Sequence, residues 1–235
     1  MTKLVLVTGA TKGIGFAISK LLNESGYTVI GIARNDIGNE FPGILFTVDL
    51  YDSKSTERLL IKIKQLYPKI RYIVNNAGIA LPQTLGNIDI NSLDLIFNLN
   101  VKTAIQVTQT FINEMKQDNF GKIINITSRA IYGAIGRSGY SAAKSALVSL
   151  TKTWALELAP YGINVNAVAP GPIDTELFRQ TRPVGSQAEK EVLEQIPLGR
   201  LGKPEDIAKT VEFLLSDNAN FITGQNINVN GGSSL

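Results

Sequence analysis

A tyrosine and a lysine one helical turn apart are the residues of this sequence best suited to proton transfer. Tyr140 and Lys144 stand in Gly-Tyr-Ser-Ala-Ala-Lys, and residues four apart share one face of a helix. Because the chain has no histidine and no cysteine, few other side chains can act as acid or base near neutral pH. A cation held close to a phenol favours the phenolate and lowers the phenol pKa. The spacing therefore predicts a Tyr–Lys pair that moves a proton.

The same absences exclude several kinds of chemistry. Without cysteine there are no disulfides, thiolate nucleophiles or cysteine–zinc sites. Without histidine, Ser-His-Asp catalysis and nearly all catalytic zinc sites are excluded. No cluster of Asp and Glu suggests a magnesium site, so no metal is expected. The net charge is +3, but Lys and Arg are scattered rather than grouped, so we do not expect nucleic-acid binding.

Short runs rich in Val, Ile and Leu alternate with longer amphipathic segments along the 235 residues. The expected strands are 3–8, 27–33, 44–48, 70–74, 121–126, 163–167 and 226–229. The expected helices are 14–25, 53–66, 92–116, 139–159, 187–195 and 204–216. This alternation predicts an α/β fold: one domain over 1–235, with a Rossmann-like doubly wound parallel sheet of about seven strands and helices on both faces. The apolar runs are too short for a membrane span or a signal peptide, so we expect a cytoplasmic protein that binds no membrane.

The first expected strand leads through a glycine-rich turn into a helix. The turn reads Thr8-Gly9-Ala10-Thr11-Lys12-Gly13-Ile14-Gly15, a G-x-x-x-G-x-G spacing. Glycines permit a tight turn and a close approach of the backbone to a pyrophosphate, and the helix start offers free amides. An ordinary glycine-containing turn is the alternative, but its place after the first strand favours a dinucleotide site. The expected contacts are Gly9, Thr11, Lys12, Gly13, Ile14 and Gly15.

The end of the second strand indicates which dinucleotide is bound. A carboxylate there would bind the ribose 2′-hydroxyl of NAD, but this chain has Ala33 followed by Arg34. Together with Lys12, Arg34 supplies two cations that suit a 2′-phosphate. We therefore predict NADP(H) as the cofactor; the alternative is that Arg34 is simply a solvated residue at the end of a strand.

Taken together, the motifs resemble the short-chain dehydrogenase/reductase family over nearly the whole chain. The marks of the resemblance are Thr8–Gly15, Asn75-Asn76-Ala77-Gly78, Asn100, Ser128, Tyr140-x-x-x-Lys144 and Pro170-Gly171. The resemblance implies a Rossmann-like fold, a nicotinamide cofactor and reversible carbonyl reduction.

The resemblance also implies four catalytic roles. Tyr140 would donate a proton to the carbonyl oxygen, and Lys144 would lower the phenol pKa and bind the nicotinamide ribose. Ser128 would hydrogen-bond the substrate oxygen, and Asn100 would steady a water that links Lys144 to solvent. Such donors stabilise the negative charge that grows on the oxygen. Each residue alone has an ordinary alternative, such as a packing aromatic, a surface cation or a cap.

Further cofactor contacts are implied beyond the glycine turn and the Tyr–Lys pair. They are Asp49 and Leu50 at the adenine, Asn76, Ala77 and Gly78 at its ribose, and Pro170, Gly171, Ile173 and Thr175 along the carboxamide. The alternative for Asp49 is a residue that starts a helix.

The spacing of serine and tyrosine departs from the usual family pattern. Many members separate the two by thirteen positions, whereas Ser128 and Tyr140 are twelve apart. Thr127 would restore thirteen. We prefer Ser128, because Asn-Ile-Thr-Ser matches the family's strand end and the loop 129–139 can absorb one residue.

The C-terminal third of the chain bears on the substrate. The polar segment 174–201 is expected to be a flexible cover over the substrate. The ending of the chain resembles the 3-oxoacyl-(acyl-carrier-protein) reductase group in three motifs: Pro-Leu-Gly-Arg-Leu-Gly-Lys-Pro-Glu-Asp from Pro197, Ile-Thr-Gly-Gln and Gly-Gly. That resemblance implies reduction of 3-ketoacyl thioesters in fatty acid biosynthesis, with acyl carrier protein as a partner.

Alternatives to this substrate and this role remain open. The same tail occurs in enzymes of sugars, steroids and secondary alcohols, and the chain could instead be a non-catalytic NADP(H)-binding regulator. Arg129 and Arg137 flank the site, as contacts for an acidic carrier or as solvated loop residues. The resemblance also implies a homotetramer paired through the helices 92–116 and 139–159.

Overall fold

Seven parallel strands form one sheet in the computed structural model, which describes residues 3–235. The strand order is β3-β2-β1-β4-β5-β6-β7, and every neighbouring pair is parallel. The strands are β1 (Lys3–Thr8), β2 (Tyr27–Ala33), β3 (Ile44–Thr47), β4 (Ile70–Asn75), β5 (Gly121–Ile126), β6 (Ile163–Pro170) and β7 (Asn226–Val229). The order reverses direction at β1, which confirms the predicted doubly wound parallel sheet.

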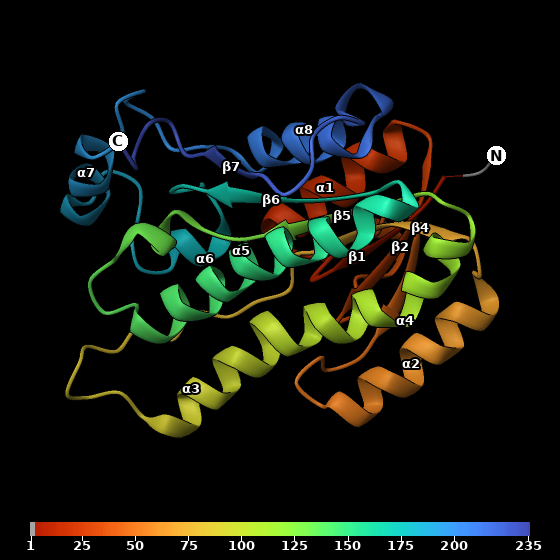
Figure 1. Ribbon diagram of the computed structural model, residues 1–235. Helices are drawn as coiled ribbons and strands as arrows, with labels where there is room; N and C mark the ends of the chain where they lie inside the picture. Colours follow the sequence, from red (N-terminus) through yellow and green to blue (C-terminus); the bar gives the residue numbers. More distant parts are fainter. Residues whose placement is uncertain (1–2) are drawn as a thin grey trace.

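Helices cover both faces of this sheet (Figure 1). They are α1 (Gly13–Glu24), α2 (Ser53–Leu66), α3 (Ile90–Phe97), α4 (Thr103–Gln117), α5 (Ser138–Leu158), α6 (Glu176–Arg179), α7 (Gln187–Glu194) and α8 (Pro204–Leu215). The helices α1 and α8 lie together on one face, and α2, α4 and α5 lie on the other. No helix within residues 3–235 is both long and apolar enough to cross a membrane.

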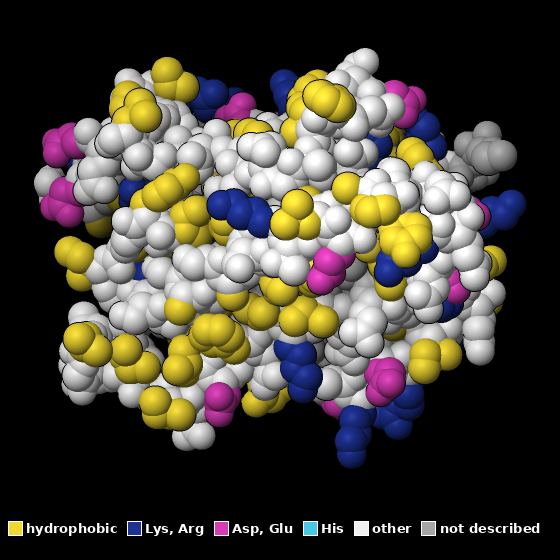
Figure 2. Space-filling model, viewed as in Figure 1, with side chains coloured by type: hydrophobic (Ala, Val, Ile, Leu, Met, Phe, Trp, Pro, Cys, Tyr) yellow, Lys and Arg dark blue, Asp and Glu magenta, His cyan; other side chains and the backbone are white. Residues whose placement is uncertain are grey.

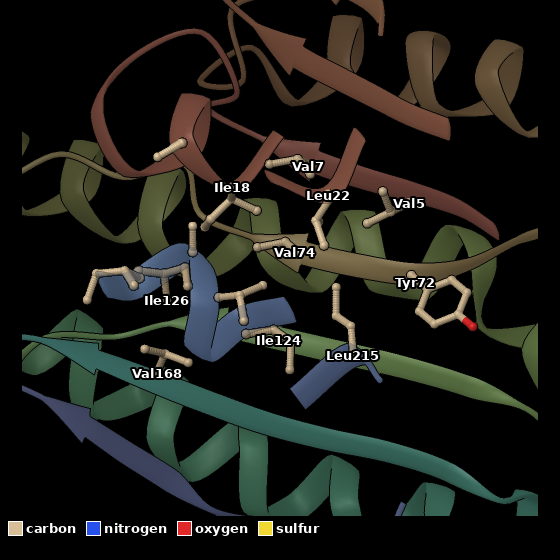
Figure 3. Packing of buried hydrophobic residues seen from close by; sticks show 14 of the residues in the cluster. Val5, Val7, Ile18, Leu22, Tyr72, Val74, Ile124, Ile126, Val168 and Leu215 are labelled. Atoms are coloured by element: carbon tan, nitrogen blue, oxygen red, sulfur yellow. The ribbon is translucent and has the colours of Figure 1, made fainter. Parts of the chain in front are cut away.

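The core consists of two apolar clusters, one on each face of the sheet. Figure 3 shows the first, in which Ile18 and Leu22 of α1 and Leu215 of α8 pack on Val74 and Ile124 of the sheet. In the second cluster, strand residues pack against α2, α4 and α5. Neighbouring residues of one strand belong to opposite clusters, which explains why the strand sequences are almost continuously apolar.

The predicted helix 92–116 is wrong in its continuity. Between α3 and α4 lies a π-helical turn over Asn98–Lys102. Asn100 lies inside it, and its side-chain amide donates to the carbonyls of Ile96 and Ile79 at 2.9 Å each. A π-turn accommodates one extra residue and is often found at functional sites. Helical periodicity alone does not reveal it.

Two smaller differences concern the region after β6. The strand was predicted to end at residue 167, but it continues to Pro170 because β7 pairs with its last four residues. The short helix α6 was not predicted. Thr175 caps its N-terminus, because the Thr175 Oγ1 accepts a hydrogen bond from the Phe178 amide at 3.3 Å. Other boundaries differ from the prediction by one or two residues.

Candidate active site

The predicted site residues gather where the strands end at their carboxyl side. The glycine turn follows β1, residues 75–78 close β4, Ser128 follows β5, and 170–175 follow β6. In Figure 1 this end of the sheet faces α6 and α7. Carboxyl ends of parallel strands are where ligands bind in open α/β sheets. The topology therefore assembles in space what the sequence separates by more than a hundred positions.

The start of α5 carries the Tyr–Lys pair. Tyr140 lies in the first turn of the helix and Lys144 one turn later. Lys144 is 3% exposed, and its Nζ donates to the Ile126 carbonyl at 2.7 Å. The same Nζ lies 5.7 Å from the centroid of the Tyr140 ring. The structure brings the two side chains together beside the end of β5.

The pKa values of this pair correct one expectation. Burial raises the pKa of the Tyr140 phenol, while hydrogen bonding with Ser128 and the charge of Arg137 act in the opposite direction. Burial lowers the pKa of Lys144 to about 8. The sequence predicted a phenol pKa lowered by Lys144; this direction is wrong for the chain by itself, because desolvation outweighs the nearby charges. The phenol is consequently protonated at neutral pH, as a proton donor must be.

The structure separates the two hydroxyl candidates at the end of β5. Thr127 is 2% exposed, and its Oγ1 lies 3.0 Å from the Val168 carbonyl and 2.7 Å from Asn226 Oδ1. Ser128 is half-buried, and its hydroxyl accepts from the Ala130 amide at 3.1 Å; it is also close enough to Tyr140 to act on the pKa of the phenol. Thr127 is thus engaged within the sheet, whereas Ser128 lies at the phenol.

Replacement of Ser128 by alanine should lower kcat for carbonyl reduction by about 10²-fold, because one preorganised donor to the reacting oxygen is lost. Thr127→Ala should change kcat much less and should lower the melting temperature, since it removes the two hydrogen bonds of a buried hydroxyl, to the Val168 carbonyl and to Asn226. Steady-state kinetics and thermal denaturation of both variants check this. A larger kcat loss in Thr127→Ala would assign the role to the threonine.

Asn100 lies beside Lys144 with one unpartnered atom. It is 1% exposed, and its Oδ1 has no hydrogen-bond partner within residues 3–235. A Cβ built on Gly78 would lie 2.4 Å from Asn100 Oδ1 and 3.3 Å from Lys144 Nζ, so both atoms border the same stretch of backbone. A buried acceptor normally has a partner. The arrangement suits a water between the amide oxygen and the lysine, the role implied by the resemblance.

The glycine turn requires glycine at three positions. Gly9 and Gly13 have φ values of +65° and +48°, a region that side chains with a Cβ rarely adopt. A Cβ on Gly15 would lie 2.0 Å from the Gly9 carbonyl oxygen and 2.5 Å from Asn76 Nδ2. The backbone therefore folds on itself at the start of α1 and leaves its amides available to an anion.

Asn76 fixes the end of β4 to this turn. Its Nδ2 donates to the carbonyls of Thr8 and Gly9 at 3.0 and 3.1 Å. The backbone amides of Asn76 and Ala77 both donate to Thr8 Oγ1 at 3.0 Å. The residues that the resemblance places at the adenine ribose thus also hold the glycine turn in position, which is a structural role that the sequence did not specify in detail.

The two cations predicted to meet a 2′-phosphate differ in their surroundings. Arg34 is exposed directly after the buried Ala33, and no salt bridge of Arg34 is formed within residues 3–235. Lys12 forms an ion pair with Glu176 of α6 at 3.4 Å, and both side chains are two-thirds exposed. The contact of Lys12 with the segment after β6 was not predicted.

Asp49 and Leu50, the two residues expected at the adenine, lie after β3. Leu50 is buried, and its carbonyl accepts from Thr103 Oγ1 at 3.4 Å. Asp49 is exposed and its Oδ1 accepts from the Tyr51 amide at 3.0 Å, whereas Asp52 caps α2. Asp49 is therefore a turn residue and does not itself cap the helix, so its outer carboxylate atom remains accessible to a ligand.

The segment predicted to follow the carboxamide reaches back to the glycine turn. Gly171 lies so close to Asn230 that a Cβ added to Gly171 would lie 2.7 Å from the Cα of Asn230. Ile173 is buried and pairs with Gly202. The Thr175 Cγ2 lies 3.3 Å from the position of a Cβ on Gly13. The segment after Pro170 therefore runs back to the glycine turn, which it approaches at Thr175.

Comparison with known proteins decides the family. A profile described as Enoyl-(Acyl carrier protein) reductase matches residues 9–234. A solved short-chain dehydrogenase/reductase variant of Serratia marcescens superposes with a TM-score of 0.90 at 29% identity, covering 99% of this chain and 98% of that one. The chain belongs to the short-chain dehydrogenase/reductase family. As a member of this family, the chain is an oxidoreductase that acts on CH–OH groups and binds a nicotinamide cofactor.

Relatives within the family differ in substrate. The 3-oxoacyl-(acyl-carrier-protein) reductase FabG of Thermotoga maritima is 39% identical over 241 residues, covering 98% of this chain and 97% of the relative. An NAD-dependent glycerol dehydrogenase of Listeria innocua is 36% identical and covers 99% and 94%. The structure of YwfH, an NADPH dependent reductase involved in bacilysin biosynthesis, has a TM-score of 0.90 at 28% identity, covering 99% and 98%. Within residues 3–235, no group of three acidic side chains gathers to hold a metal ion.

Proposed function

We propose that the chain reduces 3-ketoacyl thioesters to 3-hydroxyacyl thioesters with NADPH. The observation that supports this reaction is the position of Tyr140, whose ring centroid lies 5.7 Å from the Nζ of the buried Lys144. The substrate class is supported by the 39% identity to a 3-oxoacyl-(acyl-carrier-protein) reductase along almost the whole of both chains.

The side chains suggest how the reduction proceeds. A reduced nicotinamide, when bound, would supply the hydride that reaches the carbonyl carbon. Ser128 donates a hydrogen bond to the carbonyl oxygen and holds it at the phenol. Tyr140 gives its proton to that oxygen as charge develops there. Lys144 then stabilises the phenolate, and a water held by Asn100 returns a proton. Hydride and proton together convert the ketone into the secondary alcohol.

The preference for NADP(H) rests on charge at the end of β2. The position that carries a carboxylate in NAD-binding proteins is the buried Ala33, and Arg34 beside it is exposed. Lys12 lies within the glycine turn and forms a solvated ion pair with Glu176, an interaction of little strength. A phosphate dianion between the two cations can therefore compete for Lys12.

Arg34→Ala should raise the KM for NADPH by about tenfold, because a charge-assisted hydrogen bond to phosphate is lost. The KM for NADH should stay near the wild-type value, since NADH lacks the phosphate. Initial rates with both cofactors at a fixed carbonyl concentration measure the ratio. Equal changes for the two cofactors, or a wild-type enzyme that prefers NADH, would overturn the assignment.

An acyl carrier protein is proposed as the natural carrier of the substrate. Two arginines on the loop between Ser128 and α5 support this. Arg129 donates to the Ser233 carbonyl at 3.3 Å, and Arg137 stands at the start of α5, where its backbone bridges Gln83. Both are partly exposed, so an acidic carrier can approach them. Reduction or oxidation of another alcohol, sugar or ketone is the second candidate, favoured by the Listeria innocua glycerol dehydrogenase.

Assembly into a homotetramer is also proposed, on the basis of apolar surface over α3, α4 and α5. Phe97 and Ile105 are 36% and 37% exposed, and Leu156 is 80% exposed. A hollow of about 400 Å³ lies between α3 and α4 and includes Phe97, Val101 and Ile105 in its lining. Figure 2 shows hydrophobic side chains on this face of the molecule. Exposed apolar patches commonly mark protein contacts.

A substrate screen tests the proposed function. The purified protein is given NADPH or NADH together with acetoacetyl-CoA, small ketones and sugars, and the absorbance of the reduced nicotinamide is followed. We expect fastest consumption of NADPH with acetoacetyl-CoA. Turnover only of a polyol with NAD would favour the second candidate. Cofactor binding without turnover of any compound would favour a regulator.

A further inference from the structure

Arg179 at the end of α6 has all three guanidinium nitrogens engaged. Its Nε lies 2.6 Å from Asp174 Oδ1, and its Nη2 lies 2.8 Å from Asp174 Oδ2. The remaining Nη1 bonds to Glu189 of α7. Two parallel bonds to one carboxylate form the strong bidentate arrangement that arginine favours. One side chain therefore joins the start of the segment 174–201, its first helix and its second helix.

Glu189, the second partner, is a buried carboxylate. The residue is 8% exposed, and its Oε2 accepts from the Gly185 amide at 2.6 Å. Its own backbone amide donates to Ser186 Oγ at 3.2 Å, which caps α7. A buried carboxylate needs a cation and hydrogen bonds to offset its desolvation. Without Arg179, Glu189 would be left buried with only the Gly185 amide.

The first partner, Asp174, stands next to the residues that touch the glycine turn. Its backbone amide donates to the Gly202 carbonyl at 2.8 Å, which fixes it at the base of the segment. Thr175 follows and contacts Gly13. Glu176 comes next and pairs with Lys12 at 3.4 Å. The two ion pairs of Arg179, with Asp174 and Glu189, form what we call the ionic ring. Thr175 and Glu176 lie between Asp174 and Arg179 in the chain, and both approach the turn.

We propose that Arg179 is a positioning residue that holds Thr175 and Glu176 against the glycine turn and so shapes the cofactor pocket. The proposal rests on the proposed function only in taking the pocket to bind NADP(H). Arg179 does not touch the reacting atoms, and it acts through Asp174 and Glu189. Without the charge of Arg179, the ion pairs that join α6 to Asp174 and to α7 are lost, and Thr175 is no longer held beside the glycine turn.

Arg182 provides a matched control in the same segment. Its guanidinium lies 5.2 Å from the Phe178 ring centroid, much as that of Arg179 does at 5.6 Å. It donates to Thr181 Oγ1 at 2.9 Å and takes part in no salt bridge within residues 3–235. Substitution of Arg182 therefore removes one positive charge and one stacking contact but leaves the ionic ring intact.

Four variants test the proposal: Arg179→Gln, Arg179→Lys, Glu189→Gln and Arg182→Gln. NADPH Kd is measured by nicotinamide fluorescence, and the rate of chymotrypsin cleavage within 174–195 is measured on the full chain without substrate. In Arg179→Gln we expect the NADPH Kd and the cleavage rate each to rise by about tenfold, the equivalent of one lost charge-assisted contact. For Arg179→Lys, the NADPH Kd and the cleavage rate should lie between those of Arg179→Gln and the wild type, because lysine keeps the charge without the bidentate geometry.

Several outcomes decide the matter independently of turnover. Unchanged Kd and cleavage in Arg179→Gln would overturn the proposal, as would an equal effect in Arg182→Gln, which would point to charge alone. If Arg179→Gln does not fold, Glu189→Gln replaces it as the decisive variant, with the same tenfold expectation. If the wild type binds NADPH but reduces no ketone, the proposed function fails while these two measurements still test Arg179.

Discussion

Tyr140→Phe should lower kcat for carbonyl reduction by about 10³-fold, the effect expected when a positioned general acid is lost. The NADPH Kd should stay near the wild-type value, because the ring and the neighbouring Lys144 remain in place. Tyr140 is the proposed donor, and burial, which raises the pKa of its phenol, favours the protonated form that donation requires. Single-turnover rates with NADPH and acetoacetyl-CoA measure the step directly.

Lys144 gives this prediction a pH dependence. Its pKa lies at about 8 in the free chain, so its positive charge is lost as the pH rises through that value. In the proposed mechanism this charge stabilises the phenolate left by proton transfer, and kcat/KM reports groups of the free enzyme. We therefore expect kcat/KM for reduction to be level below about pH 8 and to decline above it, whereas Tyr140→Phe should be slow at every pH.

Tyr132→Phe is the matched control for Tyr140→Phe. Tyr132 is 57% exposed on the loop that follows Ser128, and its hydroxyl bonds to Asn228 on β7. Removing that hydroxyl should leave kcat nearly unchanged. Turnover retained in Tyr140→Phe, or a comparable loss in Tyr132→Phe, would contradict the assignment of Tyr140 as the proton donor.

Short-range patterns explain which parts of the site the sequence could predict. Tyr140 and Lys144 share a helix face because of a spacing that the sequence shows directly. The turn after β1 is set by glycines within seven residues, and parallel strands bring their carboxyl ends to one edge whatever lies between them. These features depend on local conformation and on a topology that alternating strands and helices already imply.

The features that were missed depend on tertiary contacts. In the π-turn, the Asn100 side chain bonds to the carbonyl of Ile79, which lies on a different segment of the chain. The raised phenol pKa reflects burial that no spacing reveals. The pairing of Lys12 with Glu176 joins residues 164 positions apart. The sequence shows which residues are charged, but only the folded chain shows which of them form ion pairs.

Gly15→Ala should have the largest effect on cofactor binding of any single methyl group added to this chain. The new Cβ would lie 2.0 Å from a backbone oxygen of Gly9 and 2.5 Å from the Asn76 amide nitrogen. Neither atom can move without disrupting the turn, because Asn76 is itself bonded to Thr8 and Gly9. The start of α1 must therefore shift away from β1.

The shift should cost about 3 kcal/mol of folding free energy, the upper end of the usual range for overpacking, or roughly 6–12 °C in Tm for a chain of this length. It would also displace the backbone amides that are proposed to meet the pyrophosphate. NADPH Kd should rise by about tenfold or more, since about 1.4 kcal/mol of lost binding energy is a factor of ten. Thermal denaturation and fluorescence titration measure the two effects.

Gly121→Ala distinguishes this local effect from a general cost of adding a methyl group. Gly121 is buried at the start of β5, and a Cβ there would lie 2.8 Å from the Met115 sulfur. A methionine side chain can rotate away, whereas a backbone carbonyl cannot. Gly121→Ala should therefore lower Tm less and leave the NADPH Kd unchanged. An equal change of Kd in both variants would mean that Gly15 affects binding only through overall stability, and the turn would lose its assignment as the phosphate site.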